Sequence, residues 1–263
     1  MSGHRPRKRF GQHFLTDPGV IDAILRAIDP RQSDVVVEIG PGRGAITASI
    51  AAKAGHLHCI ELDRDLAAAL RKQYAGHDNV TIHEADALRF DYASLGDSLR
   101  IVGNLPYNIS TPLLFRLLEC REHISDMHFM LQKEVVDRMA ATPGSKAYGR
   151  LGIMLRCHLD IQALFDVDRR SFDPPPAVTS AVVRLRPLAA GNFEIEDHAL
   201  LGRVVATAFS QRRKTVRNAL KSLVDENELE ALGIDPGLRP EGLPIGEYVA
   251  LANYLARRTD DSG

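Results

Sequence analysis

The sequence of 263 residues is poor in cysteine and contains no long hydrophobic run. Its three cysteines show no Cys-x-x-Cys spacing, so they predict neither a disulfide framework nor a zinc site, and we expect no metal. No apolar stretch approaches the roughly 20 residues that a membrane-spanning helix needs. Charged residues stand where a signal peptide would need an apolar segment. These absences predict a cytoplasmic protein with no membrane partner.

The chain also lacks the net charge that would point to a nucleic acid, since its formal charge is −1. The charges are nevertheless segregated along the sequence. Residues 1–16 contain Arg7, Lys8 and Arg9 and no acid, and residues 198–224 contain six basic residues and no acid. A nucleic-acid partner would therefore have to be recognised mainly by these two segments.

Short β-branched runs alternate with helix-like segments over most of the chain. The runs are mostly continuous in hydrophobicity, which is typical of parallel strands buried on both faces. They are DVVVEIG, HLHCIELD, NVTIHEAD, LRIVGN, MHFMLQ, QALFDV and AVTSAVVRLRP. We predict an α/β fold with an open, Rossmann-like sheet of about seven strands, the last two of which could pair antiparallel at one edge.

The pattern changes after Pro187, where a loop-like segment leads into sequence that is typical of helices alone. We therefore predict an α/β domain over residues 1–190, with residues 1–16 as a basic amino-terminal segment, and a smaller helical domain over residues 191–263. In TAFSQRRKTVRNALKSL, apolar residues form one stripe of a predicted helix, and Arg213, Arg217 and Lys221 recur every four residues on another face. We expect a monomer, because no signal of oligomerisation is present.

Glycines and acids follow the first three predicted strands. Gly40 and Gly42 stand in EIGPGRG, at a strand-to-helix junction where glycine lets the backbone approach a ligand. Glu61 ends the second strand, about twenty residues later, and can accept from both hydroxyls of a ribose. Asp86, with Ala87 beside it in EADAL, ends the third strand and could accept from an adenine amino group. Together they favour an adenosine-containing ligand, whereas the glycines alone fit a dinucleotide equally well.

The fourth predicted strand ends in Asn-Leu-Pro-Tyr. Asn104 offers an amide oxygen, Leu105 offers a backbone carbonyl, and Pro106 forms a rigid turn with no competing donor. Two converging acceptors suit the two hydrogens of a primary amine on a ring, because they turn the nitrogen lone pair toward a reaction partner. Tyr107 can stack on that ring.

These motifs, in this order, resemble those of S-adenosylmethionine-dependent adenine-amino methyltransferases. KRFGQHFL, MLQKEVVDRM, SKAYGRLGI, FDPPPAVTSAVVRL and FSQRRKTVRNAL narrow the resemblance to the ribosomal RNA adenine dimethyltransferases that act on 16S ribosomal RNA. The similarity runs from about Lys8 to Tyr254. It implies S-adenosylmethionine as the methyl donor. It also implies two adjacent target adenines in a hairpin loop near the 3′ end of the small-subunit RNA, within a pre-assembled particle.

The resemblance also implies roles for individual residues. Around the methyl donor it places His13, through its side chain or its backbone, and Leu15, Gly40, Glu61, Asp86 and Asn104. It implies that Phe172, in SFDPPP, covers the face of the target adenine opposite Tyr107, and the alternative is a core position beneath the proline loop. Contacts with RNA are implied for Arg7, Lys8, Arg9, Lys146, Arg150, Arg212, Arg213, Lys214, Arg217 and Lys221.

Three other functions remain open from the sequence. A 23S ribosomal RNA adenine dimethyltransferase shares NLPY and the fold, but FSQRRKTVRNAL favours the 16S enzymes. A nicotinamide-dependent oxidoreductase would explain the glycines and Glu61 but leaves NLPY without a role. A non-enzymatic ribosome-assembly factor would keep the RNA surface, although Asn104 and Tyr107 argue against assembly as the sole role.

Overall fold

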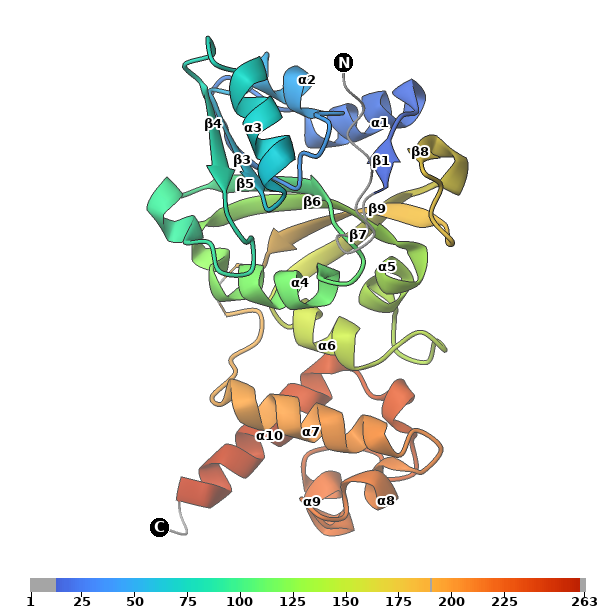
Figure 1. Cartoon of the computed structure of the whole chain (residues 1–263). Coiled ribbons are helices and arrows are strands. Elements are labelled where there is room, and N and C mark those ends of the chain that lie inside the picture. The colour runs from blue at the N-terminus through green and yellow to red at the C-terminus, as the bar shows by residue number, and fades with distance from the viewer. Residues whose placement is uncertain (1–12, 190, 261–263) are drawn as a thin grey trace. The chain divides into compact units, whose positions relative to one another are not determined.

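The structure, a computed structural model, describes residues 13–189 and 191–260 (Figure 1), so Arg7, Lys8 and Arg9 lie outside the described residues. The chain divides into two compact units. The first comprises Met1–Val136 and Ile161–Pro187, and the second comprises Asp137–Asp160 and Leu188–Gly263. The chain passes from the first unit into the second for the last time after Pro187, near the boundary predicted at residue 190. Residues 137–160, however, join the second unit, which differs from the predicted division, because their apolar side chains pack in its core.

A seven-stranded sheet with the order β4-β3-β2-β5-β6-β9-β7 is the centre of the first unit. The strands from β4 to β6 in this order are parallel, and β9 runs antiparallel to β6. This confirms the predicted α/β fold and its number of strands. The strands are β2 (Val35–Ile39), β3 (His56–Glu61), β4 (Val80–Glu84), β5 (Leu99–Asn104), β6 (Ile124–Gln132), β7 (Leu159–Val167) and β9 (Ser180–Pro187).

Helices cover both faces of this sheet. Figure 1 shows α1, α2 and α3 on one side of the sheet and α4 on the other. Asp17 and Asp63 are the N-caps of α1 and α3, because the Asp17 carboxylate accepts from two backbone N–H groups of the first turn and the Asp63 carboxylate accepts from one. The bounds are α1 (Pro18–Ile28), α2 (Thr47–Ala51), α3 (Arg64–Gln73) and α4 (Ser110–Glu119), while α5 (Lys133–Ala140) leads from the first unit into the second.

A separate two-stranded sheet attaches the segment before α1 to the loop before β9. Its strands, β1 (Phe14–Leu15) and β8 (Phe172–Asp173), are antiparallel. The backbone N–H of Thr16 donates to the Ser171 carbonyl at 2.8 Å. The Ser171 hydroxyl donates to the carboxylate of Asp17 at 3.0 Å. These contacts fix the first described residues to the loop before β9.

Arg100 joins the amino-terminal ends of the central strands. From β5, its guanidinium donates to both carboxylate oxygens of Asp126 on β6, at 3.0 and 2.8 Å. It also donates to the carboxylate of Asp34 at 2.7 Å and to the carbonyl of Ile28 at 2.6 Å. The Arg100 side chain is only 15% exposed, so this cluster is a largely buried ion pair whose hydrogen-bonding groups are satisfied.

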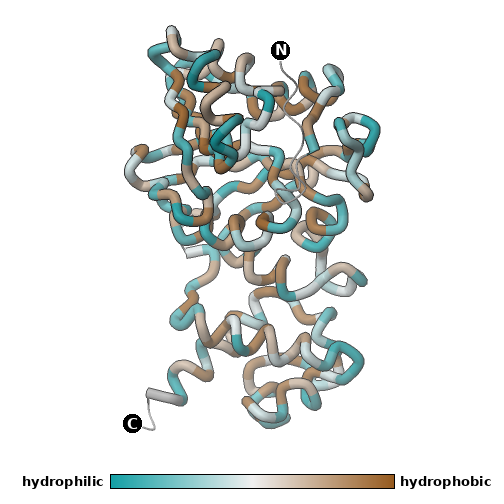
Figure 2. Tube along the Cα trace, in the orientation of Figure 1, coloured by the Kyte–Doolittle hydropathy of each residue, from teal (hydrophilic) through white to brown (hydrophobic). Residues whose placement is uncertain are grey.

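The second unit is helical and has a core of its own. Buried tyrosines tie it together, since the hydroxyls of Tyr148 and Tyr248 donate to the carbonyls of Leu243 and Pro240. Figure 2 shows hydrophobic and hydrophilic residues interspersed along its helices, as helices with one buried face require. They are α6 (Arg150–Arg156), α7 (His198–Ser210), α8 (Val216–Leu220), α9 (Glu226–Ala231) and α10 (Ile245–Asp260).

The predicted continuous helix over TAFSQRRKTVRNALKSL is wrong, because α7 ends at Ser210 and α8 begins at Val216. The break has a physical cause in a distant loop. The first N–H groups of α8, from Val216 and Arg217, donate to the carbonyls of Leu238 and Pro236. These hydrogen bonds to a distant loop fix the position at which α8 begins.

This break changes the predicted arrangement of the basic residues. Arg213 lies in the turn before α8 and therefore shares no helix face with Arg217 and Lys221. The apolar stripe, in contrast, persists in two pieces. Val205 and Ala208 on α7, like their counterparts on α8, are fully buried in the core of the second unit.

We predict that Gly103→Ala lowers the free energy of unfolding by about 1–3 kcal/mol, a typical cost of overpacking. A Cβ at this position of β5 would lie 2.5 Å from the carbonyl oxygen of Ile39 on the neighbouring strand. Urea denaturation measures the change. Gly76→Ala is the control, because a Cβ there meets no atom within 4 Å. Equal losses in the two variants would contradict the close approach.

Candidate active site

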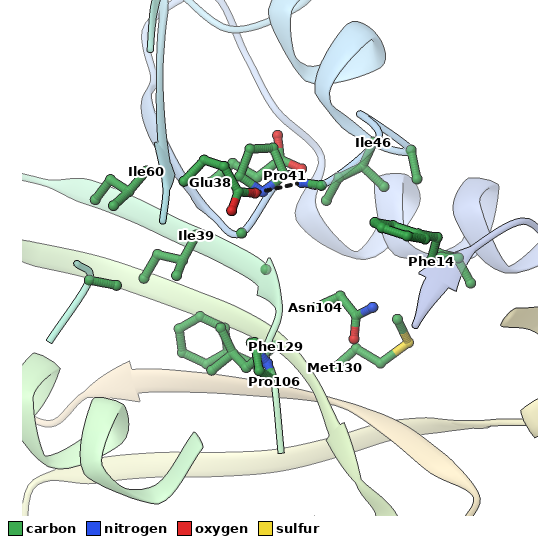
Figure 3. Close-up of a pocket in the computed structure, with 18 of the residues that line it drawn as sticks. Phe14, Glu38, Ile39, Pro41, Ile46, Ile60, Asn104, Pro106, Phe129 and Met130 are labelled. Atoms are coloured by element: carbon green, nitrogen blue, oxygen red, sulfur yellow. Dashed lines mark hydrogen bonds between the residues drawn. The ribbon is translucent and has the colours of Figure 1, made fainter. Parts of the chain in front are cut away.

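A cavity of about 410 Å³ opens at the edge of the main sheet where the parallel strands end. Its walls are formed by residues 13–16 of the amino-terminal segment, the glycine loop after β2 and the ends of β3 and β5 (Figure 3). Because parallel strands end at one edge, residues far apart in sequence meet here. The predicted site residues that line it are His13, Leu15, Gly40, Gly42, Glu61, Asp86, Ala87, Asn104, Leu105, Pro106 and Tyr107.

The glycine loop provides a close backbone approach on one wall. Gly40 and Gly42 have φ angles of 66° and 59°, a left-handed conformation that favours glycine. A Cβ on Gly42 would lie 3.2 Å from the ring of Phe14, which belongs to the amino-terminal segment. The guanidinium of Arg43 lies 4.2 Å from the centre of the same ring. The segment and the loop therefore pack directly on each other.

Glu61, at the end of β3, is fixed by backbone donors. One carboxylate oxygen accepts from the N–H of Gly42 at 3.1 Å, and the other accepts from the N–H of Asp63 at 2.8 Å. Burial raises the pKa of Glu61, and these hydrogen bonds oppose that rise. Each oxygen retains a lone pair. The carboxylate can thus accept two hydroxyls at the cavity wall without changing its position.

Asp86 lies in the turn after β4, since that strand ends two residues earlier, at Glu84. One oxygen of its carboxylate accepts from the N–H of Leu88 at 2.9 Å. The hydroxyl of buried Tyr92 donates to the carbonyl of Ala87 at 2.9 Å and so holds this turn in place. Asp86 therefore caps its own turn, and its other oxygen is free of that role.

Asn104 has its amide oriented by the amino-terminal segment. The side-chain nitrogen donates to the carbonyl of His13 at 3.0 Å. The amide oxygen is therefore the remaining acceptor of this side chain, and Figure 3 shows Asn104 between Phe14 and Met130 at one end of the cavity. His13 is itself held, because its Nδ1 lies 2.8 Å from the carbonyl oxygen of Pro174. The structure thus gives His13 a backbone contact at this position.

Tyr107 follows the proline turn and is half-buried. Its hydroxyl and the hydroxyl of Ser180, on β9, are 2.8 Å apart, and burial raises the pKa of the phenol. Its ring lies 6.1 Å from the ring of His13 at an interplanar angle of 26°. The backbone N–H of Leu105 donates to the carbonyl of Met130 at 3.2 Å, so the start of the turn is anchored to β6. Both ends of Asn-Leu-Pro-Tyr are therefore fixed.

Phe172 corrects the sequence prediction. It is 3% exposed, belongs to the hydrophobic core beside Leu15, and is absent from the cavity wall within the described chain. The pairing of β1 with β8 is the reason, since Phe172 stands opposite Leu15 in that pair. The structure supports the alternative of a core anchor and shows no stacking surface opposite Tyr107 from this residue.

Two buried polar residues of the cavity wall were missed by sequence reasoning. Glu38 on β2 and His128 on β6 are 2% and 3% exposed. Burial, assisted by the charge of Glu61, raises the pKa of Glu38 to about 7. Burial is also the main reason that the pKa of His128 falls to about 4. In the sequence, these two positions were marked only by a polar residue inside an apolar run, in DVVVEIG and in MHFMLQ.

The described residues, 13–189 and 191–260, contain neither a candidate metal site nor a helix that could span a membrane. Among these residues no three or more His, Cys, Asp or Glu side chains are grouped so that they could hold a metal ion. No helix formed by them is long and apolar enough to cross a membrane.

The predicted RNA contacts that the structure describes all belong to the second unit and are exposed. Arg212 donates to the carbonyls of Lys146 and Tyr148, at 3.1 and 3.2 Å, and thereby ties the turn after α7 to the loop before α6. The others are Lys146, Arg150, Arg213, Lys214, Arg217 and Lys221.

Arg217 corrects one premise of the sequence prediction, which counted no acids near these basic residues. It forms an ion pair with Glu226, the first residue of α9, with an N–O distance of 2.8 Å. An acid nine residues away in sequence thus becomes a direct partner in the fold.

Comparison with known proteins agrees with this site. The family profile described as ribosomal RNA adenine dimethylase matches residues 3–257. A protein of Aromatoleum aromaticum named ribosomal RNA small subunit methyltransferase A is 56% identical over 259 residues, covering 98% of this chain and 97% of the relative. A protein of the same name from Thiobacillus denitrificans is 56% identical over 255 residues, covering 97% and 100%.

Two solved structures are similar over nearly the whole chain. A dimethyladenosine transferase from Plasmodium falciparum superposes with a TM-score of 0.83 at 27% identity, covering 94% of this chain and 98% of that one. The 23S ribosomal RNA methyltransferase ErmE superposes with a TM-score of 0.76 at 26% identity, covering 92% and 99%.

The strand order, the glycine loop and the acids at successive strand ends define a methyltransferase of the Rossmann-like class I fold. Within that class, this chain belongs to the ribosomal RNA adenine dimethylase family.

We predict that Glu38 makes stability depend on pH. Its folded-state pKa of about 7 lies above the ordinary value of 4.5, so between these values the folded state binds more protons than the unfolded state. Stability from this group is therefore lost as the pH rises, by about 1.4 kcal/mol per pH unit and roughly 3 kcal/mol in total. Urea denaturation of the protein and of Glu38→Gln between pH 4.5 and 7.5 measures the difference.

The difference between the two curves isolates Glu38 from other titrating groups, because those are common to both proteins. Glu119→Gln, at an exposed position of α4, is the control and should follow the unchanged protein across the same pH range. Parallel curves for the protein and for Glu38→Gln would show that Glu38 keeps its ordinary pKa in the folded state.

Proposed function

We propose that this chain transfers two methyl groups from S-adenosylmethionine to the exocyclic amino group of adenines in 16S ribosomal RNA. The observation that carries the proposal is the Asn104 amide, whose oxygen is left as an acceptor in a cavity that also contains the glycine loop and Glu61. The curated relatives that share 56% identity are small-subunit methyltransferases by name, whereas the 23S enzyme is 26% identical. That difference favours the 16S substrate over the 23S alternative.

The cavity residues fit the proposed methyl donor. Gly40 and Gly42 leave room for a ligand against the backbone, and Glu61 presents two oxygens to the hydroxyls of a ribose. Asp86, in the turn after the next strand, can accept from an adenine amino group. When bound, a sulfonium donor supplies a methyl group on a good leaving group. The chain itself then needs no strong base, and orientation is its main contribution.

The reacting amine is oriented by the Asn-Leu-Pro-Tyr turn. The Asn104 amide oxygen and the Leu105 carbonyl accept its two hydrogens, so the nitrogen lone pair faces the methyl group. Tyr107 stacks on the adenine, a contact worth roughly 1–3 kcal/mol. The proton that the amine loses passes to water. Tyr107 and Phe172 are the two residues predicted to stack on the adenine. Because Phe172 lies in the core, Tyr107 is the one of the two that lies at the described site.

We further propose that the targets are two adjacent adenines of a hairpin loop near the 3′ end of the RNA, in a pre-assembled particle. Such a base must leave its stack, at a cost of a few kcal/mol. The exposed Lys146, Arg150, Arg213, Lys214 and Lys221 of the second unit would bind RNA phosphates. Arg217 contributes less, because Glu226 already neutralises it.

Methyl transfer from tritiated S-adenosylmethionine to small ribosomal subunits that lack the modification tests the whole proposal. Nucleoside analysis should find dimethyladenosine in the 3′-terminal part of the 16S RNA. Purified large subunits serve as the matched substrate control. Labelling of large subunits alone would establish the 23S alternative, and labelling of neither would support a non-enzymatic assembly role.

We predict that Asn104→Ala lowers the rate of methyl transfer at least about 100-fold, as expected for losing an oriented group at the reacting atoms. Its affinity for small subunits should change less than about twofold, because Asn104 binds one base and not the RNA backbone. Filter binding measures the affinity, and Asn192→Ala, in an exposed loop of the second unit, is the control. Parallel loss of rate and affinity would make Asn104 a structural residue.

We predict that replacing Arg213, Lys214 and Lys221 together by alanine weakens RNA binding and flattens its salt dependence. Each lost phosphate contact lowers the slope of log affinity against log salt by about 0.7–0.9, so the slope should fall by about 2 to 3. Arg217→Ala should change the slope by clearly less than one contact. An unchanged slope in the triple variant would remove these residues from the RNA surface.

A further inference from the structure

His128 is a buried base that the proposed mechanism leaves unused. It lies in the middle of β6, is 3% exposed, and lines the cavity together with Asn104 and Met130. Neither of its ring nitrogens has a hydrogen-bond partner within the described part of the chain. A buried polar group without a partner costs free energy, so such groups in native proteins call for an explanation.

The surroundings of His128 select one tautomer. Its Nδ1 lies 3.8 Å from a carboxylate oxygen of Asp126, two residues earlier on the same strand. Arg100 holds that carboxylate through two hydrogen bonds, so Asp126 presents a fixed negative charge to the ring. Negative charge beside Nδ1 favours the hydrogen on Nδ1. Nε2 then carries the lone pair and is a hydrogen-bond acceptor.

The sheet register places a second acceptor in the same row. Glu38 stands opposite Val102, and Val102 stands opposite His128, on the adjacent strands β2, β5 and β6. Residues paired in this way point to the same face of a parallel sheet. Glu38 and His128 therefore flank one apolar side chain beneath the cavity, and both line its wall. The carboxyl group of Glu38 and a neutral imidazole both offer acceptors, and together they suit a cationic group with several N–H donors.

The order of the lining residues across the sheet indicates which part of the donor reaches this row. Asp86 and Glu61 follow β4 and β3, where the proposed function puts the adenosine, and Asn104 ends β5, where it puts the reacting methyl. The amino-acid end of the donor, which carries an ammonium group, must extend away from the adenosine. Glu38 and His128 are buried polar residues of the cavity wall that the adenosine and the reacting amine leave without a role, and His128 lies on β6, beyond β5 as seen from the adenosine.

We propose that His128 is a positioning residue that accepts a hydrogen bond, directly or through one water, from the ammonium group of the methyl donor. This inference rests on the proposed function and extends it to a residue outside the strand-end motifs. The Arg100–Asp126 pair is part of the same arrangement, because it fixes the ring and its tautomer.

Replacing His128 by an apolar residue distinguishes a role in ligand binding from a purely structural role. His128→Leu removes two buried nitrogens that have no hydrogen-bond partner among the described residues, so the protein without ligand should keep or raise its Tm. If His128 serves the ligand, the same variant should lose ligand affinity. A gain in stability together with a loss of binding cannot come from general damage to the fold.

Isothermal titration calorimetry on the full chain tests the inference with three ligands. S-adenosylhomocysteine has the complete amino-acid end, its decarboxylated analogue keeps only the ammonium, and 5′-methylthioadenosine lacks both groups. His128→Leu should bind the first two about tenfold more weakly and the third with unchanged affinity. His128→Gln, which puts an amide oxygen near the position of Nε2, should recover affinity to within about threefold of the unchanged protein.

Each outcome decides between the claims. Equal loss for all three ligands, with a lower Tm, would make His128 a structural residue. Loss confined to S-adenosylhomocysteine would show that His128 serves the carboxylate, and unchanged binding of every ligand would show that it serves neither group. Both results overturn the inference while leaving the proposed donor intact. Failure of the unchanged protein to bind S-adenosylhomocysteine would instead overturn the proposed function itself.

Discussion

The hydrogen bond from the side chain of Asn104 to the carbonyl of His13 is the contact on which the active site depends. It decides which atom of the amide remains as an acceptor, and so which kind of group the site can hold. It also fixes the segment before α1 over the end of β5. The ring of Phe14 then covers Gly42, and the cavity obtains its outer wall. One interaction thus links the shape of the pocket to its chemistry.

Much of this site could be predicted from the sequence because its residues stand at the ends of parallel strands. A strand-length apolar run shows where each strand ends, and the fold brings those ends to one edge. Gly40, Glu61, Asp86 and Asn104 accordingly line one cavity. The turn chemistry of Asn-Leu-Pro-Tyr is equally local. Neither inference required knowledge of which distant segments touch.

The predictions that were wrong concern residues whose surroundings depend on contacts with distant parts of the sequence. Phe172 is a core residue because β8 pairs with β1, and no local pattern announces that pairing. The helix break before Val216 depends on acceptors at Pro236 and Leu238, and the pairing of Arg217 depends on the placement of α9. Glu38 and His128 were not predicted as cavity residues, because the sequence of an apolar strand does not show which of its side chains face a cavity.

The pairing of β1 with β8 also sets an order on the synthesis of the protein. His13 and Asp17 are held by Pro174 and Ser171, contacts that span 161 and 154 residues of chain. During translation the amino-terminal segment therefore leaves the ribosome long before its partners exist. The cavity wall closes only once nearly all of the first unit has been made, so a nascent chain cannot hold the methyl donor in its complete site before that point.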